Sequence, residues 1–125
     1  PSNPRTLTSL QGLGSLLLAK GNLSEAESLL KEALDGRIAV LKEQHPLVAD
    51  TRYLYAKALL EQSKFAEAEQ PAILAAKASQ TQASSAPKAA RNIQLVIDLY
   101  TRWHTAEPNP HHDEQAQEWK KQLPP

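Results

Sequence analysis

The residues of this chain best suited to hold a metal ion gather near its C-terminus. They are His104, His111, His112, Asp113 and Glu114. Imidazole and carboxylate groups are common zinc ligands, but adjacent histidines rarely point the same way. The segment 108–110, Pro-Asn-Pro, is typical of an exposed, partly stiff loop, and Asp113 is better explained as the cap of a final helix. The sequence therefore favours a solvated polar loop, with no metal and no cofactor.

Nucleophilic catalysis would need a serine or cysteine with a base beside it. Ser84 and Ser85 lie in "QASSAPK", a segment typical of a turn, and no base or oxyanion donor can be named for them. The chain has no cysteine, no phosphate-binding glycine loop, no HExxH pair and no nucleophile-elbow serine. These residues predict a non-catalytic chain.

The elements that position these groups repeat along the chain. A shift of 42 residues places Glu25-Ala26-Glu27 on Glu67-Ala68-Glu69, and it also pairs Pro4 with Pro46, Leu17 with Leu59, Leu18 with Leu60 and Ala33 with Ala75. Pro87 follows in nearly the same phase. Since proline is tolerated at the first helical position, the three prolines predict three helix starts. A repeat of this length indicates a stacked array.

Each unit reads as two helices separated by a tight turn. Apolar spacing predicts helices over 5–20, about 24–43, 47–62, 66–81, from about 88, and 113–122. Ser24 and Glu27 form a capping box for the second helix, and Gly36 within it costs about 1 kcal/mol. The fold class is therefore all-α: an α-solenoid of about three helix-turn-helix repeats with six helices.

Small residues recur where helices must approach closely. Gly14 and Ala26 are the expected crossing of the first helix pair, and Ala56 and Ala68 that of the second. Ala33 and Ala75 are expected where the next unit packs. The alanines thus form a packing pattern and not a catalytic motif.

"LGSLLLAKGNLSEAESLLKEAL" (13–34) followed by "VLKEQHPLVADT" (40–51) resembles the tetratricopeptide repeat, in its 42-residue form as in kinesin light chains. "LVIDLYTRW" and "DEQAQEWKKQL" resemble the closing repeat of bacterial arrays. The resemblance implies a right-handed superhelix in one domain, 1–125, with repeats at 4–45, 46–86 and 87–125. The third is an atypical capping repeat, in which a loop insertion, "HTAEPNPH" at 104–111, interrupts the turn.

In this family the first helix of each unit lines a concave groove, so the resemblance implies a protein-binding surface. Its residues are Gln11 and Ser15, with Thr8 beside them, then Asp50, Tyr53, Lys57, Glu61, Arg91, Gln94, Asp98 and Arg102. Only Lys57 and Arg91 look like members of the basic set that grips a peptide's terminal carboxylate, so that clamp is not supported.

Composition narrows the class of partner. The formal net charge is zero, with 14 basic and 14 acidic residues, which argues against nucleic acid and anionic membranes. No apolar run approaches the roughly 20 residues that span a bilayer. The lack of cysteine fits a reducing compartment, and we predict a cytoplasmic protein. The start at Pro1 and the absence of Met predict a piece of a longer chain.

The leading function is a non-catalytic protein–protein interaction module that binds a peptide or partner helix. One alternative is a regulatory segment of a larger bacterial regulator or serine/threonine kinase whose activity lies elsewhere. Another is self-association through the leucine-rich first repeat, where Leu18, like Leu60 in the second, extends the apolar run.

Overall fold

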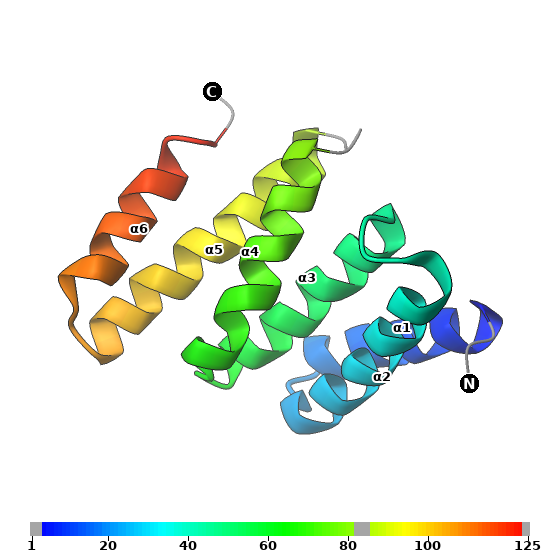
Figure 1. Ribbon diagram of the computed structural model, residues 1–125. Helices are drawn as coiled ribbons and strands as arrows, with labels where there is room; N and C mark the ends of the chain where they lie inside the picture. The colour runs from blue at the N-terminus through cyan, green and yellow to red at the C-terminus, as the bar shows by residue number, and fades with distance from the viewer. Residues whose placement is uncertain (1–3, 82–85, 124–125) are drawn as a thin grey trace.

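The computed structural model describes residues 4–81 and 86–123, and over these residues the chain forms six α-helices. They are α1 (Pro4–Ala19), α2 (Leu23–Leu41), α3 (Pro46–Glu61), α4 (Phe65–Thr81), α5 (Ala86–Ala106) and α6 (Pro110–Lys120). Consecutive helices form three hairpins, which lie side by side in chain order (Figure 1). The predicted all-α helical-repeat solenoid is confirmed.

Proline and a capping side chain mark the start of two helices. Pro46 begins α3, and Nδ1 of His45 accepts a hydrogen bond from the backbone N–H of Leu47 at 3.1 Å. Pro110 begins α6 in the same way, where the Asn109 side chain accepts from the N–H of His111 at 2.9 Å. In both cases the missing N–H of proline costs nothing, because the first turn of a helix has no internal partner for it.

Two expected caps are wrong. Asp113 lies inside the first turn of α6, since Asn109 holds the cap position. The α2 helix begins at Leu23, and Asn22 at its cap position makes no side-chain capping bond, so Ser24 and Glu27 do not form a capping box.

The Glu27 side chain forms hydrogen bonds with the next hairpin and not with the start of its own helix. Its Oε1 accepts bonds from Gln62 Nε2 and Lys64 Nζ, both at 2.8 Å. The bond from Lys64 lowers the pKa of Glu27 below its ordinary value, despite partial burial. The carboxylate therefore ties α2 to the turn that follows α3.

The predicted loop insertion at 104–111 is also wrong. The α5 helix continues to Ala106 and α6 begins at Pro110, so only residues 107–109 separate them. His104 stabilises this short turn, because its Nδ1 accepts the N–H of Asn109 at 3.0 Å. The proline-rich segment is thus a helix start and not a long loop.

Glycines allow the close approach of α1 and α2. A Cβ added to Gly14 would lie 2.7 Å from Leu30 Cγ and 3.6 Å from the carbonyl oxygen of Ala26, which confirms Gly14 and Ala26 at the expected crossing. A Cβ on Gly36 would clash with Leu7 Cδ2, the end of a buried side chain of α1. The Leu7 side chain would have to shift to make room, so Gly36 also favours the close packing of the two helices.

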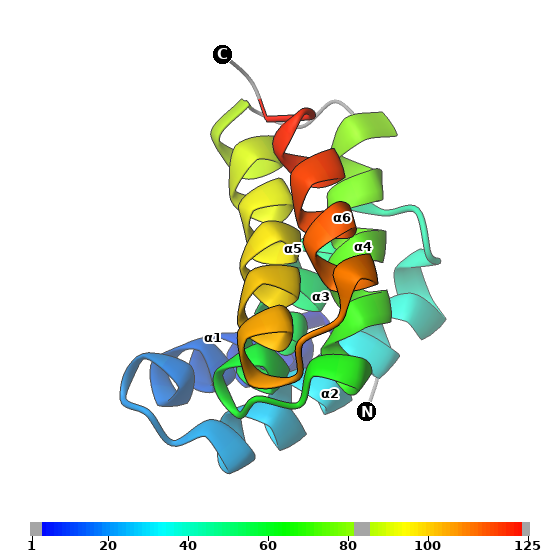
Figure 2. The same cartoon turned by 90° about the vertical axis from the view of Figure 1, so that its left-hand side faces the viewer.

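Successive hairpins meet through the second helix of one and the first helix of the next, α2 against α3 and α4 against α5. In the view of Figure 2, α1 and α5 lie toward one side and α2 and α4 toward the other. Asn92 of α5 donates through Nδ2 to the carbonyl oxygen of Ala75 in α4 at 3.2 Å. This contact confirms that Ala75 lies where the next unit packs.

The hydrophobic core is unequal along the array. A large cluster joins α3, α4, α5 and α6 and includes Leu99, Tyr100 and Trp119. A smaller cluster joins Ala26 and Leu30 of α2 to α3, with further leucines of α1 packed against it. Since burial of apolar surface supplies most of the stability, we expect the first hairpin to be held less firmly than the other two.

We expect amide hydrogen exchange to report this difference. Amides in the middle of α1 should exchange at least about 10-fold faster than those in the middle of α5, because the small cluster allows local opening. Exchange followed by mass spectrometry on peptides of both helices would measure the rates. Equal protection would mean that the array opens as one unit.

Candidate protein-binding groove

Seven of the expected groove residues line one hollow between α3 and α5. They are Tyr53, Lys57, Glu61, Arg91, Gln94, Asp98 and Arg102. The hollow has a volume of about 170 Å³, and its floor includes Leu60 and Leu95. The helical periodicity of α3 and α5 brings these side chains together because both helices turn the same face outward.

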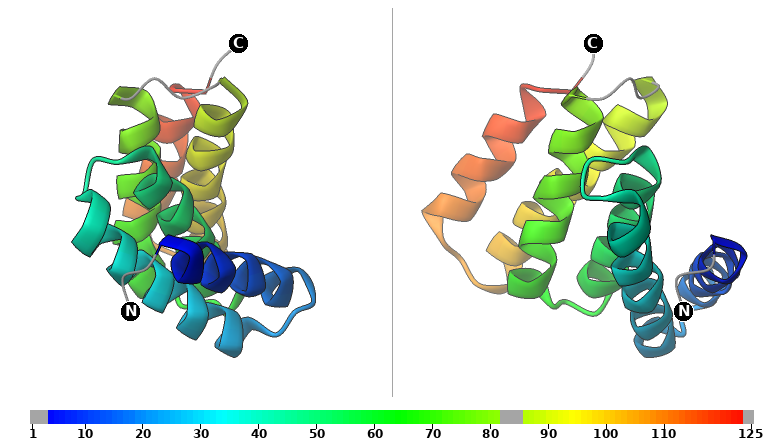
Figure 3. Two further views of the ribbon diagram at one scale, coloured as in Figure 1. Left: turned by 90° about the vertical axis from the view of Figure 1, so that its right-hand side faces the viewer. Right: turned by 45° about the vertical axis from the view of Figure 1, so that its right-hand side comes forward.

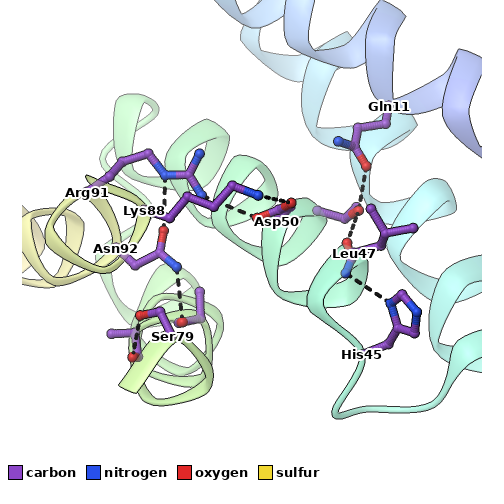
Figure 4. Close-up of polar contacts among 11 residues, drawn as sticks. Gln11, His45, Leu47, Asp50, Ser79, Lys88, Arg91 and Asn92 are labelled. Atoms are coloured by element: carbon purple, nitrogen blue, oxygen red, sulfur yellow. Dashed lines mark hydrogen bonds and ion pairs between the residues drawn. The ribbon is translucent and has the colours of Figure 1, made fainter. Parts of the chain in front are cut away.

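Asp50 joins the two helices at one end of this face. Its carboxylate lies 3.1 Å from Lys88 Nζ and 3.5 Å from Arg91 Nη2, and both cations are on α5 (Figure 4). The Asp50 side chain is about a quarter exposed, so these ion pairs are partly shielded from solvent. Asp50 thus acts as an interhelical contact in the unbound chain.

Arg91 holds several groups in place at once. Its guanidinium lies over the Tyr53 ring, 4.0 Å from the centroid, and its Nε donates to Asn92 Oδ1 at 3.1 Å. Figure 4 shows the contact between Arg91 and Asn92. Asn92 in turn donates to the carbonyl oxygen of Ala75. The tyrosine and arginine therefore present one preorganised surface.

Further along α5, other polar side chains also pair within the groove. Arg102 Nη1 lies 3.4 Å from Glu61 Oε1 across the two helices. Gln94 donates to Asp98 at 2.9 Å along α5 itself. The first contact pairs opposite charges, and the second gives the Asp98 carboxylate a hydrogen-bond donor.

A second hollow adjoins the first, between α1 and α3. It has a volume of about 420 Å³ and is lined by Ser15, Leu18, Ala19, Gly21, Leu23, Leu54, Lys57 and Glu61. Lys57 and Glu61 border both hollows, so the two form one continuous groove across α1, α3 and α5. The α1 side of this groove is apolar, whereas the α5 side is polar.

Lys57 differs from the other charged residues of the groove. In the part of the chain that the structure describes, its ammonium makes no hydrogen bond or ion pair. It lies half-buried at the junction of the two hollows. An ammonium in this position can accept an anionic group from a ligand without first losing a partner.

Two expected groove residues serve the packing of helices instead. Gln11 Oε1 accepts from the buried Thr51 hydroxyl at 2.6 Å, which links α1 to α3 (Figure 4). The Thr8 hydroxyl accepts from Arg37 of α2 at 3.3 Å. Neither residue lines the two hollows.

The apolar members of the groove were not expected. Leu60 and Leu95 belong to the large cluster and Leu54 packs against the smaller one, so each is a core residue that also borders a hollow. Leu18 was singled out as extending the apolar run, and it packs with Leu54 between α1 and α3.

The histidines near the C-terminus make different contacts. His112 is buried and stacks on Trp103, with ring centroids 4.0 Å apart, while His104 contacts Asn109. Among the described residues, no three His, Asp or Glu side chains converge as metal ligands would. The other candidate residues, Ser84 and Ser85, lie outside the described residues.

None of the helices in residues 4–81 and 86–123 is both long and apolar enough to cross a bilayer.

In a comparison with protein families, the family model described as tetratricopeptide repeat matches residues 5–80. No curated protein matches the chain.

Proposed function

The chain belongs to the tetratricopeptide repeat family, and we propose that it binds a segment of a partner protein in the groove formed by α1, α3 and α5. Tetratricopeptide repeats generally mediate protein–protein interactions and are typically non-catalytic. The observation that carries the proposal is the continuous groove, in which Lys57 and Glu61 join two adjoining hollows.

The chemistry of the groove indicates how a segment would bind. An apolar side chain of the partner fits the α1–α3 hollow against Leu18 and Leu54, where it removes apolar surface from water. A carboxylate near it pairs with Lys57. On the α5 side, the Tyr53–Arg91 stack offers a rigid face that needs no reordering on binding.

We predict that Lys57→Met weakens binding about 10-fold, because it removes the unpaired ammonium and keeps the aliphatic length. Peptides would be selected from a random displayed library on the immobilised native chain and then titrated by fluorescence anisotropy. Lys120→Met is the matched control, since it makes the same change on the exposed surface of α6, away from the groove.

Two results would contradict the proposal. Selected peptides that bind the native chain, Lys57→Met and Lys120→Met equally well would place binding elsewhere. A selection that recovers no peptide at all would dismiss the groove as a peptide site.

The remaining alternatives stay predictions of the sequence. They are membership of a larger bacterial regulator or kinase, self-association through the first repeat, and a cytoplasmic location.

A further inference from the structure

Another hollow lies at the edge of the array, away from the groove. It has a volume of about 320 Å³ and is lined by residues 63–67 together with Trp103 and Glu107. In the right-hand view of Figure 3, the turn after α3 and the turn after α5 lie at the same lower edge. The hollow shares no lining residue with the two hollows of the groove, so a ligand could occupy it independently.

Two aromatic rings form the apolar wall of this edge hollow. Phe65 and Trp103 lie nearly parallel, at 16°, with ring centroids 6.1 Å apart. Trp103 also stacks on the buried ring of His112, with centroids 4.0 Å apart, so core packing fixes its position. Trp103 itself is only partly buried, and it borders the hollow. Among aromatic side chains, tryptophan attracts a cation most strongly.

Carboxylates set the charge of the edge hollow. Glu67 and Glu107 both line it, and neither side chain makes a hydrogen bond or ion pair within residues 4–81 and 86–123. Lys64 also lines it, but its ammonium bonds to Glu27 of α2 at 2.8 Å. The positive end of α4 and the negative end of α5 both lie here and offset each other. The hollow therefore carries a net negative charge beside its aromatic wall.

We propose that the edge hollow binds an arginine side chain of a partner protein. A guanidinium pairs with carboxylates through several N–H donors and stacks on aromatic rings, so it uses both features of the hollow. An anionic group would be repelled by Glu67 and Glu107. An apolar side chain would cover these carboxylates without giving them a hydrogen bond, which costs free energy.

A small probe tests the site without knowledge of the partner. N-acetyl-arginine methylamide carries a guanidinium and no other charge. In two-dimensional NMR of the isotope-labelled chain, it should shift the Trp103 indole N–H and the amides of residues 63–67. These shifts should saturate in the millimolar range, as expected for one side chain at a partly exposed site. N-acetyl-citrulline methylamide has nearly the same shape without the charge, and it should leave these signals unchanged.

Glu67→Gln with Glu107→Gln should weaken binding of the arginine probe at least about 10-fold, because it removes both charges and keeps the side-chain shape. Glu32→Gln with Glu114→Gln is the matched control, since it makes the same change in net charge at exposed glutamates of α2 and α6. This control should bind the probe like the native chain.

Three results would each overturn the proposal. They are the absence of saturable shifts at the edge hollow, equal binding of the citrulline probe, and equal affinity in the Glu67 and Glu107 variant. None of them involves Lys57 or a selected peptide, so this site and the groove can fail separately.

Discussion

Replacing Tyr100 with alanine should lower the free energy of unfolding by about 3–5 kcal/mol, the range for deleting a buried aromatic side chain. Tyr100 is only 2% exposed and lies in the large cluster that joins α3 to α6. Its ring lies beside those of Trp103 and His112, with centroids 6.2 Å away in each case. Alanine at this position would leave a cavity in the cluster.

Tyr100→Phe separates packing from hydrogen bonding. The Tyr100 hydroxyl donates to Glu69 Oε2 at 2.7 Å, so phenylalanine keeps the ring and removes one charge-assisted bond. We expect a loss of about 1.5–3 kcal/mol, with the alanine variant clearly the worse of the two. Urea denaturation of the three chains at pH 7 measures both differences. Equal losses in the two variants would show that the ring contributes nothing beyond its hydroxyl.

The same hydroxyl gives a test in alkali. Burial, and next the bond to Glu69, raise the pKa of Tyr100 well above its ordinary value. The folded chain therefore holds this proton more tightly than the unfolded chain, and the stability it contributes is complete below the unfolded pKa of about 10. That contribution should fall as the pH rises above this value, and Tyr100→Phe should show a smaller fall.

Alanine at Gly14 and alanine at Gly12 should have opposite effects on stability. Both residues lie in α1, and both changes gain about 1 kcal/mol of helix propensity. Nothing lies within 4 Å of a Cβ at Gly12, whereas a Cβ at Gly14 meets the fully buried Leu30. Because the contact is with Leu30 Cγ, the branch point, rotation of the side-chain end cannot relieve it.

We therefore expect Gly14→Ala to unfold about 1–3 kcal/mol more easily than Gly12→Ala, the usual cost of overpacking. The comparison cancels the propensity term, so it isolates the crossing of α1 and α2. Denaturant titrations at a low and equal protein concentration would measure the difference. Equal stabilisation by both substitutions would show that the two helices separate at no cost.

The hairpins could be predicted because their causes are local. Apolar residues at helical spacing and prolines at helix starts act within one or two turns, and Pro46 and Pro110 begin helices for this reason. The third hairpin was misread because Pro108-Asn109-Pro110 matches both a loop and a helix start. The turn is held by His104, which lies in the last turn of α5 and bonds to Asn109, a contact that the local sequence pattern does not reveal.

The sequence predicted which residues line the groove better than it predicted the contacts between them. The phase of α3 and α5 is enough to place Tyr53 and Lys57 beside Arg91. The pairing of Asp50 with α5 and of Gln11 with Thr51 depends on how closely neighbouring hairpins approach, which periodicity does not specify. The same holds for Glu27, whose partners arrive from the turn after α3.

The difference in size between the two hydrophobic clusters also predicts how the chain would respond to mechanical load. The first hairpin joins the rest through the small cluster around Ala26, Leu30 and Ala58. Tension applied between the two ends would therefore peel α1 and α2 away first, as a separate low-force event. The four remaining helices share one larger cluster and would rupture together at higher force. Half of the groove would survive the first event, with the α3–α5 hollow still intact.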